Sequence, residues 1–174
     1  MNDNTRNIFL RGAESGIPFG IYLSIASIAT VFGDRMEFLS LLSMCMILFI
    51  PILVYRFQRR QYVASEMQAT HSELWIHGII MNIGGAAICA LVTYAVIDIF
   101  RPNYVAEMMN QSLEIMKSDP ILRGTEVVKT LDKAMDNNYY PRVIELVMQM
   151  FWLTSFLGSI GSAVTALIAR RNRK

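Results

Sequence analysis

The sequence predicts an all-α fold, a four-transmembrane-helix bundle with an amphipathic helical outer loop between helices three and four. Of the 174 residues, 53% are hydrophobic and only 17% are charged, whereas a soluble domain carries about 25% charged residues. Residues 74–100 contain no Lys or Arg, and as a helix they would be about 40 Å long, enough to cross a hydrocarbon core of about 30 Å. We therefore expect a single membrane domain over residues 1–174.

The expected spans follow the apolar runs, which cover about residues 16–33, 36–55, 74–100 and 143–169. A tight turn at Gly33, Asp34 and Arg35 separates the first two, and a polar segment separates the second from the third. The first run has a basic start like a signal peptide. Glu14 interrupts the transition into the apolar run, so we expect this run to be retained as a helix.

The basic residues predict the orientation. With the N-terminus inside, the inner segments hold nine basic and four acidic residues, while the outer segments outside the apolar runs hold seven of each. Basic residues are enriched in cytoplasmic segments next to membrane spans. We expect a multi-pass protein of the bacterial inner (cell) membrane with both termini cytoplasmic.

The outer loop, residues 101–142, contains two helical patterns separated by Asp119, Pro120 and Gly124. The apolar positions are Val105, Met108, Met109, Leu113 and Met116 in the first pattern, and Val127, Val128, Leu131 and Met135 in the second. Because their charges are mixed rather than all basic, packing of the two helices on each other is favoured over a position on the bilayer surface.

A resemblance to a known family rests on Tyr55-Arg56, on Glu73-Leu74-Trp75, and on the segment from Ile99 to Tyr104. In the order of these features the chain resembles small four-helix membrane proteins of Bacteroidetes-type bacteria, domain-of-unknown-function family 4199. The resemblance covers nearly the whole chain and implies a fold and a location, but no activity. The family commonly has Asp before Pro where this chain has Arg101, so no role for that carboxylate carries over.

Small residues recur every fourth position and predict close helix packing. In helix one they are Gly12, Gly16, Gly20 and Ser24, and helix four carries Ser155 and Ser159. Either a second copy or a neighbouring helix of the same bundle could occupy these faces. The bundle is favoured because four helices already supply enough partners. Whether the two halves of the chain are a duplication stays open.

A candidate polar cluster lies near the outer ends of helices three and four, and comprises Tyr94, Asp98, Glu145 and Gln149. Carboxylates at this level either pair with nearby arginines or form a cation or proton site at the mouth of a cavity. We expect the middle of every helix to be apolar or small, which favours the structural interpretation.

Catalytic and metal motifs are not apparent. The sequence has no P-loop, no dinucleotide-binding glycine motif and no Ser/His/Asp set, and His71 and His77 point in different directions on one helix. Cys45 and Cys89 are expected to be small packing residues. We expect no enzymatic activity, no cofactor, no metal and no nucleic-acid partner.

Two functions remain. The first is a non-enzymatic structural or partner-binding membrane protein. The alternative is a small-solute or ion transporter, which could be proton-coupled. The expected partner is the lipid bilayer, and a homo-oligomer or another membrane protein is left open.

Overall fold

A computed structural model describes residues 3–136 and 140–171, and this part of the chain contains helices and no strand. The helices are α1 (Asp3–Val31), α2 (Glu37–Ala64), α3 (His71–Phe100), α4 (Tyr104–Ser118), α5 (Glu126–Asp136) and α6 (Val143–Arg171). The predicted all-α class is confirmed, with a helical bundle and a pair of shorter helices between the third and fourth long ones.

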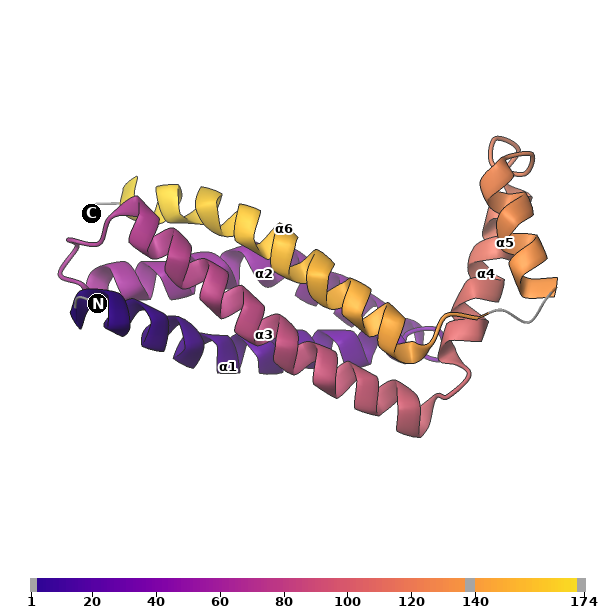
Figure 1. Ribbon diagram of the computed structural model, residues 1–174, viewed down its shortest axis with the longest axis horizontal. Coiled ribbons are helices and arrows are strands. Elements are labelled where there is room, and N and C mark those ends of the chain that lie inside the picture. Colours follow the sequence, from indigo (N-terminus) through magenta and orange to yellow (C-terminus); the bar gives the residue numbers. More distant parts are fainter. Residues whose placement is uncertain (1–2, 137–139, 172–174) are drawn as a thin grey trace. The chain divides into compact units, whose positions relative to one another are not determined.

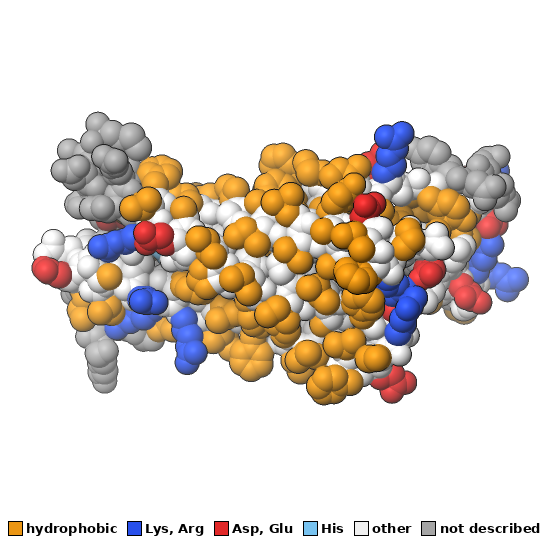
Figure 2. Space-filling model, turned by 90° about the horizontal axis from the view of Figure 1, so that it is seen from below, with side chains coloured by type: hydrophobic (Ala, Val, Ile, Leu, Met, Phe, Trp, Pro, Cys, Tyr) orange, Lys and Arg blue, Asp and Glu red, His pale blue; other side chains and the backbone are white. Residues whose placement is uncertain are grey.

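Four of these helices are long and apolar enough to cross a bilayer, namely α1 from Ile8, α2, α3 and α6. In Figure 2, hydrophobic side chains cover the middle of the bundle, and basic and acidic side chains lie toward both ends of the view. Apolar side chains exposed along helices of this length face lipid rather than water. The chain is a multi-pass membrane protein.

The helices extend beyond the apolar runs in the sequence. α1 begins at Asp3, and α2 continues through Arg56, Arg59 and Arg60 to Ala64. Arg and Gln are good helix formers, so a helix continues past the hydrocarbon core where the sequence merely turns polar. At the start of α3, the Glu73 carboxylate accepts a hydrogen bond from the Thr70 backbone N–H at 2.7 Å, and the Thr70 hydroxyl accepts one from the Glu73 N–H at 3.3 Å. This capping box fixes where α3 begins.

The chain forms two compact units, and the first comprises residues 1–93 and 148–174. In this unit α1, α2, α3 and α6 run lengthwise beside one another (Figure 1). One group of its core side chains consists of Phe19, Leu23, Val54 and Met81, and another of Tyr62, Ala69, Leu74 and Ala166. The most apolar stretch of α1 has half of its residues buried, against 11% in α2, so α1 is the inner helix and α2 exposes most of its surface to lipid.

The second unit, residues 94–147, contains α4 and α5. These two helices lie side by side as a hairpin (Figure 1). Val105, Leu113 and Val128 are buried, and Lys117 Nζ lies 2.6 Å from Asp132 Oδ1. The two amphipathic helices predicted from the sequence therefore form and pack on each other.

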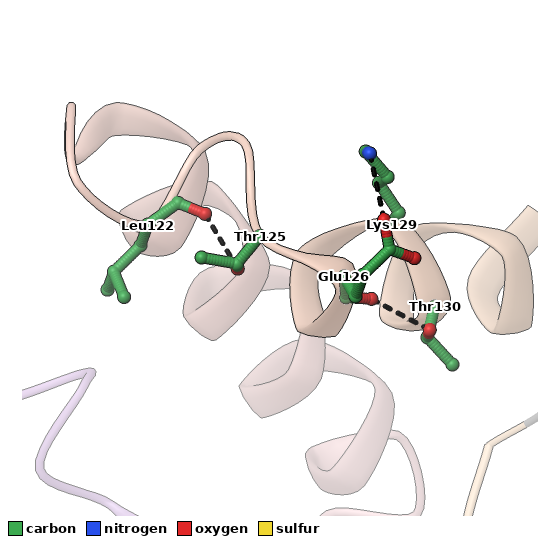
Figure 3. Close-up of polar contacts among 5 residues, drawn as sticks. All are labelled: Leu122, Thr125, Glu126, Lys129 and Thr130. Atoms are coloured by element: carbon green, nitrogen blue, oxygen red, sulfur yellow. Dashed lines mark hydrogen bonds and ion pairs between the residues drawn. The ribbon is translucent and has the colours of Figure 1, made fainter.

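Local hydrogen bonds shape the turn of the hairpin. Asp119 Oδ1 accepts a hydrogen bond from the Ile121 backbone N–H at 2.8 Å. The Thr125 hydroxyl donates to the Leu122 carbonyl, and the first turn of α5 adds a contact between Lys129 and Glu126 (Figure 3). An Asx turn of this kind satisfies the backbone just after α4 ends at Ser118, and it leaves the side chains of the turn exposed.

Candidate functional site

Four polar side chains are almost fully buried inside the first unit. They are Gln58 of α2, His77 and Asn82 of α3, and Ser162 of α6, and none is more than 1% exposed. We call this group the polar seam. A polar group in the apolar interior of a membrane bundle is costly unless it is hydrogen-bonded, so the partners of each side chain indicate what the seam does.

Asn82 joins α3 to α6. Its amide Nδ2 donates to the Ser162 hydroxyl at 2.8 Å, to the Gly158 carbonyl at 3.3 Å and to the carbonyl of Gly78 in its own helix at 2.7 Å. A Cβ atom at Gly158 would collide with the Asn82 amide. The missing side chain at Gly158 is therefore what lets the amide approach the α6 backbone.

Gln58 joins α2 to Ser162 of α6. Its Nε2 donates to the Ser162 carbonyl at 2.9 Å, and more weakly to the Leu74 carbonyl at 3.4 Å. A Cβ atom at Gly78 would lie 2.6 Å from both Gln58 Nε2 and Ser162 Oγ. Close to the helix end, Arg59 Nη1 donates to the Ala169 carbonyl at 2.8 Å, so α2 holds α6 at two levels.

Gln58 Oε1 has no hydrogen-bond partner among the described residues, and His77 also leaves part of its hydrogen-bonding capacity unused. Its Nε2 lies 3.3 Å from the Ser15 hydroxyl of α1, and its buried Nδ1 has no hydrogen-bond partner among the described residues. The Arg11 backbone carbonyl lies near the ring without forming a well-aligned hydrogen bond. His77 also lines a cavity of about 260 Å³ between α1, α2 and α3, so this end of the seam meets open space.

The glycine face of α1 packs against α3. A Cβ atom at Gly20 would lie 2.9 Å from the Ile88 Cβ, and one at Gly16 would lie 3.3 Å from the Met81 carbonyl oxygen. Gly12 is similarly close to Ile80.

The other predicted packing residues also lie within the first unit. Ser24 Oγ donates a hydrogen bond to the Gly20 carbonyl. The Ser159 carbonyl accepts a hydrogen bond from Trp75 Nε1 at 3.0 Å. The Ser159 hydroxyl donates a hydrogen bond to the Ser155 carbonyl.

The predicted cluster of Tyr94, Asp98, Glu145 and Gln149 is distributed over both units. Tyr94 and Asp98 line a cavity of about 550 Å³ in the second unit. Glu145 is exposed, and its carboxylate accepts a hydrogen bond from the Arg142 backbone N–H at 3.3 Å in the first turn of α6. Gln149 is exposed in the first unit. Joint action of these four residues stays a prediction.

The second unit also contains a buried arginine. The Arg101 side chain is 2% exposed, pairs with the Glu107 carboxylate, and lies 5.1 Å from the centre of the Tyr104 ring. The Arg101 guanidinium thus ties the end of α3 to the first turn of α4. Among the described residues, no group of three or more His, Cys, Asp or Glu side chains is placed to hold a metal ion.

The family described as "protein of unknown function (DUF4199)" matches residues 14–171. The chain belongs to this family. No curated protein and no solved structure matches it. The matched range includes α2 to α6 and the part of α1 from Glu14 onward, so most of both compact units belongs to the family's domain.

Asn82 and Gln58 were missed as candidate residues. The expectation that the middle of every helix is apolar or small is wrong at Asn82, which lies near the middle of α3 and is 1% exposed. Asn82 is the one amide side chain within residues 74–100, and a lone amide in an apolar run is the signal that could have identified it. Gln58 carried no such signal, because it stands among arginines in a segment interpreted as a loop.

Proposed function

We propose that this DUF4199 protein is a non-enzymatic protein of the bacterial inner membrane, with both termini in the cytoplasm, that acts by contact between its α4–α5 hairpin and another protein of the same membrane. One observation carries the proposal, the exposed apolar side chains at the turn of the hairpin. The charge distribution outlined above supports the orientation.

The apolar tip, as we call this surface, consists of Ile115, Ile121, Leu122 and Val127. Ile121 is 84% exposed, Ile115 70% and Val127 66%. They are close in sequence to the connection between α4 and α5, outside the four candidate spans. A patch of exposed apolar side chains that is rimmed by polar residues and lies outside the membrane spans marks an interaction site.

The charges next to the apolar tip favour a protein over the bilayer surface as its partner. Glu114, Asp119 and Glu126 alternate along the chain with Lys117, Arg123 and Lys129. A helix that binds an anionic lipid surface carries an excess of basic residues on its polar face. A mixed set of charges around apolar anchors is instead typical of a protein interface, with its polar rim.

The polar seam supports a structural role for the bundle. Asn82 and Gln58 direct their amide N–H groups at carbonyl and hydroxyl oxygens of neighbouring helices. Groups engaged in this way hold helices together and are not available to a permeating solute. This favours a fixed bundle that displays the hairpin.

A site-specific photocrosslinker tests the contact. Placed at Ile121 in cells, it should give one discrete protein adduct, and Val127→Asp should abolish that adduct. The same crosslinker at Leu41, which is 62% exposed on the apolar face of α2, is the control and should give lipid adducts alone. Lipid adducts alone at Ile121 would contradict the proposed protein contact.

The alternative function is transport of a small solute or ion, and the cavity lined by Asp98 is the observation that favours it. Its polar side chains are those of Tyr94, Asp98, Asn103, Tyr140 and Arg142. Transport requires that purified protein in proteoliposomes conduct protons or cations above the level of empty vesicles, and that Asp98→Asn abolish the flux while the fold survives. We expect no flux from the unmodified protein.

A further inference from the structure

The 260 Å³ cavity next to His77 lies at the end of the bundle that holds the chain termini. Its polar lining residues are Arg11, Glu14 and Ser15 of α1, Arg60 and Gln61 of α2, and His77 of α3, while Pro18, Phe57 and Ala64 give it an apolar wall. Its volume is several times the roughly 30 Å³ that one liquid water occupies. The cavity therefore has room for a small organic group rather than a single ion.

In the part of the chain that the structure describes, no ion pair joins Arg11, Glu14 or Arg60 to another residue. His77 is 1% exposed, and its Nδ1 has no hydrogen-bond partner there. A buried ring nitrogen with no partner costs free energy, and a ligand in the cavity could supply the missing hydrogen bond.

The lining carries both positive and negative side chains, and together they indicate which charges the ligand has. Two guanidinium groups suit an anionic oxygen group such as phosphate, which arginine binds with paired N–H donors. The Glu14 carboxylate would repel a simple anion, but it would attract an ammonium group on the same ligand. A ligand that carries both groups uses every charge of the lining.

We propose that this cavity binds a zwitterion in which a phosphate is joined by a short link to a primary ammonium group, with Arg11 and Arg60 at the phosphate and Glu14 at the ammonium. His77 hydrogen-bonds the ligand at the inner wall. The proposal goes beyond the hairpin contact, since it concerns the first unit alone.

The depth of the cavity suits a lipid headgroup as the source of this chemistry. Arg11 lies just before the apolar run of α1, which begins at about Gly16, and Arg60 lies in the last turn and a half of α2, which ends at Ala64. Residues at these positions lie near the boundary between hydrocarbon and headgroups. A free phosphoamine from the aqueous phase carries the same groups, so the experiment must separate the two sources.

The test uses delipidated, full-length protein in detergent and native mass spectrometry. The probes are phosphatidylethanolamine, phosphatidylcholine and phosphatidylglycerol, with free phosphoethanolamine tested by thermal stabilisation. Phosphatidylcholine has the same phosphate but no ammonium N–H, and phosphatidylglycerol has no ammonium at all. The variants are Arg60→Gln and Glu14→Gln. The matched control is Arg56→Gln, an exposed arginine one turn away on α2 that is not among the residues lining the cavity.

We expect phosphatidylethanolamine to bind about tenfold more tightly than the other two lipids, since a hydrogen bond to a charged group is stronger than a neutral one. Arg60→Gln and Glu14→Gln should each remove this preference, and Arg56→Gln should leave it unchanged. Stabilisation by free phosphoethanolamine, with the same dependence on the two variants, would support the site with a soluble source.

Equal binding of the three lipids overturns the proposal, as does equal loss in Arg60→Gln and Arg56→Gln. Binding that depends on Arg60 but not on Glu14 overturns it too, because the site would then hold a simple anion. Circular dichroism of each variant without ligand checks the fold. If Arg60→Gln unfolds, Arg60→Lys takes its place, and it should weaken binding by loss of the paired N–H donors.

Discussion

The bundle and the hairpin both expose large apolar side chains, but for different reasons. In the bundle, Phe38 and Leu91 are each 72% exposed on helices long enough to span a membrane. In the hairpin, Ile121 is 84% exposed on a segment that no candidate span includes. The same exposure signifies contact with lipid in the first case and, in the function we propose, an unoccupied protein contact in the second. Exposed apolar surface can be interpreted only once it is known whether lipid or water surrounds that surface.

The interiors of the two units differ as well. The bundle combines close backbone approach at Gly16 and Gly20 with buried amides at Gln58 and Asn82. The hairpin has a small apolar interface and an exposed ion pair between Lys117 and Asp132, which contributes at most about 1 kcal/mol. Substitutions in the bundle should therefore affect the whole protein, and those in the hairpin should act locally.

The largest effect is expected for Gly20→Leu. A Cβ at this position already lies 2.9 Å from the Ile88 Cβ and 3.1 Å from the Gly85 Cα, so a larger side chain forces α1 away from α3. We expect a loss of about 3 kcal/mol in the free energy of unfolding, measured by thermal unfolding in detergent. Gly161→Leu is the control, since a Cβ there meets nothing within 4 Å. Equal losses would mean that the α1–α3 contact is not close.

Leu113→Ala should weaken the hairpin alone. Leu113 is 6% exposed, and removing a buried Leu side chain costs about 2 kcal/mol or more. Amide hydrogen exchange should speed up throughout α4 and α5 and stay unchanged in α1 and α3. An increase across the bundle as well would show that the two units do not unfold separately.

Asn82→Ala should have an intermediate effect. Hydrogen bonds between membrane helices contribute on average about 0.6 kcal/mol each, with a maximum near 1.7, and Asn82 makes two to α6. We expect a loss of about 1 kcal/mol in the free energy of unfolding. A double-mutant cycle with Ser162→Ala isolates the contact between these two side chains, and a coupling energy of zero would remove this hydrogen bond from the explanation.

The smallest change in stability is expected for Ile121→Ser, within about 0.5 kcal/mol, because an exposed side chain away from packing contributes little to folding. The substitution should nevertheless abolish co-purification with the protein crosslinked at this position. Leu91→Ser, on the lipid face of α3, is the matched variant and should leave co-purification intact. If both variants retain the partner, the apolar tip is not the contact.

How far the sequence predicts this molecule depends on the kind of pattern. Four spans and two amphipathic helices follow from the length and period of apolar runs, and the structure contains all six. The seam at Gln58 and Asn82 depends on which side chains from distant helices meet, which the period of one helix does not specify. The cavity at His77 is hidden for the same reason, since its lining comes from three helices.

The helix ends were harder to predict than the spans. Charged residues such as Arg59 and Arg60 end an apolar run without ending a helix, so the basic segment after the second run lies within α2. The turn that follows depends on Glu66 and Met67, which adopt left-handed backbone conformations with φ of 54° and 64°. Neither residue type favours that conformation, so the sequence contains no local signal for this turn.

The central proposal is that the hairpin lies outside the membrane on the side opposite the termini, and cysteine labelling tests it most directly. With Cys45 and Cys89 replaced by Ala, single cysteines are introduced at Ser118, in the last turn of α4, and at Gln68, between α2 and α3; both positions are exposed. A membrane-impermeant maleimide should label Ser118→Cys in right-side-out vesicles, and Gln68→Cys only after the vesicles are opened. Labelling of both positions from the same side would contradict the four-span topology and the contact function that depends on it.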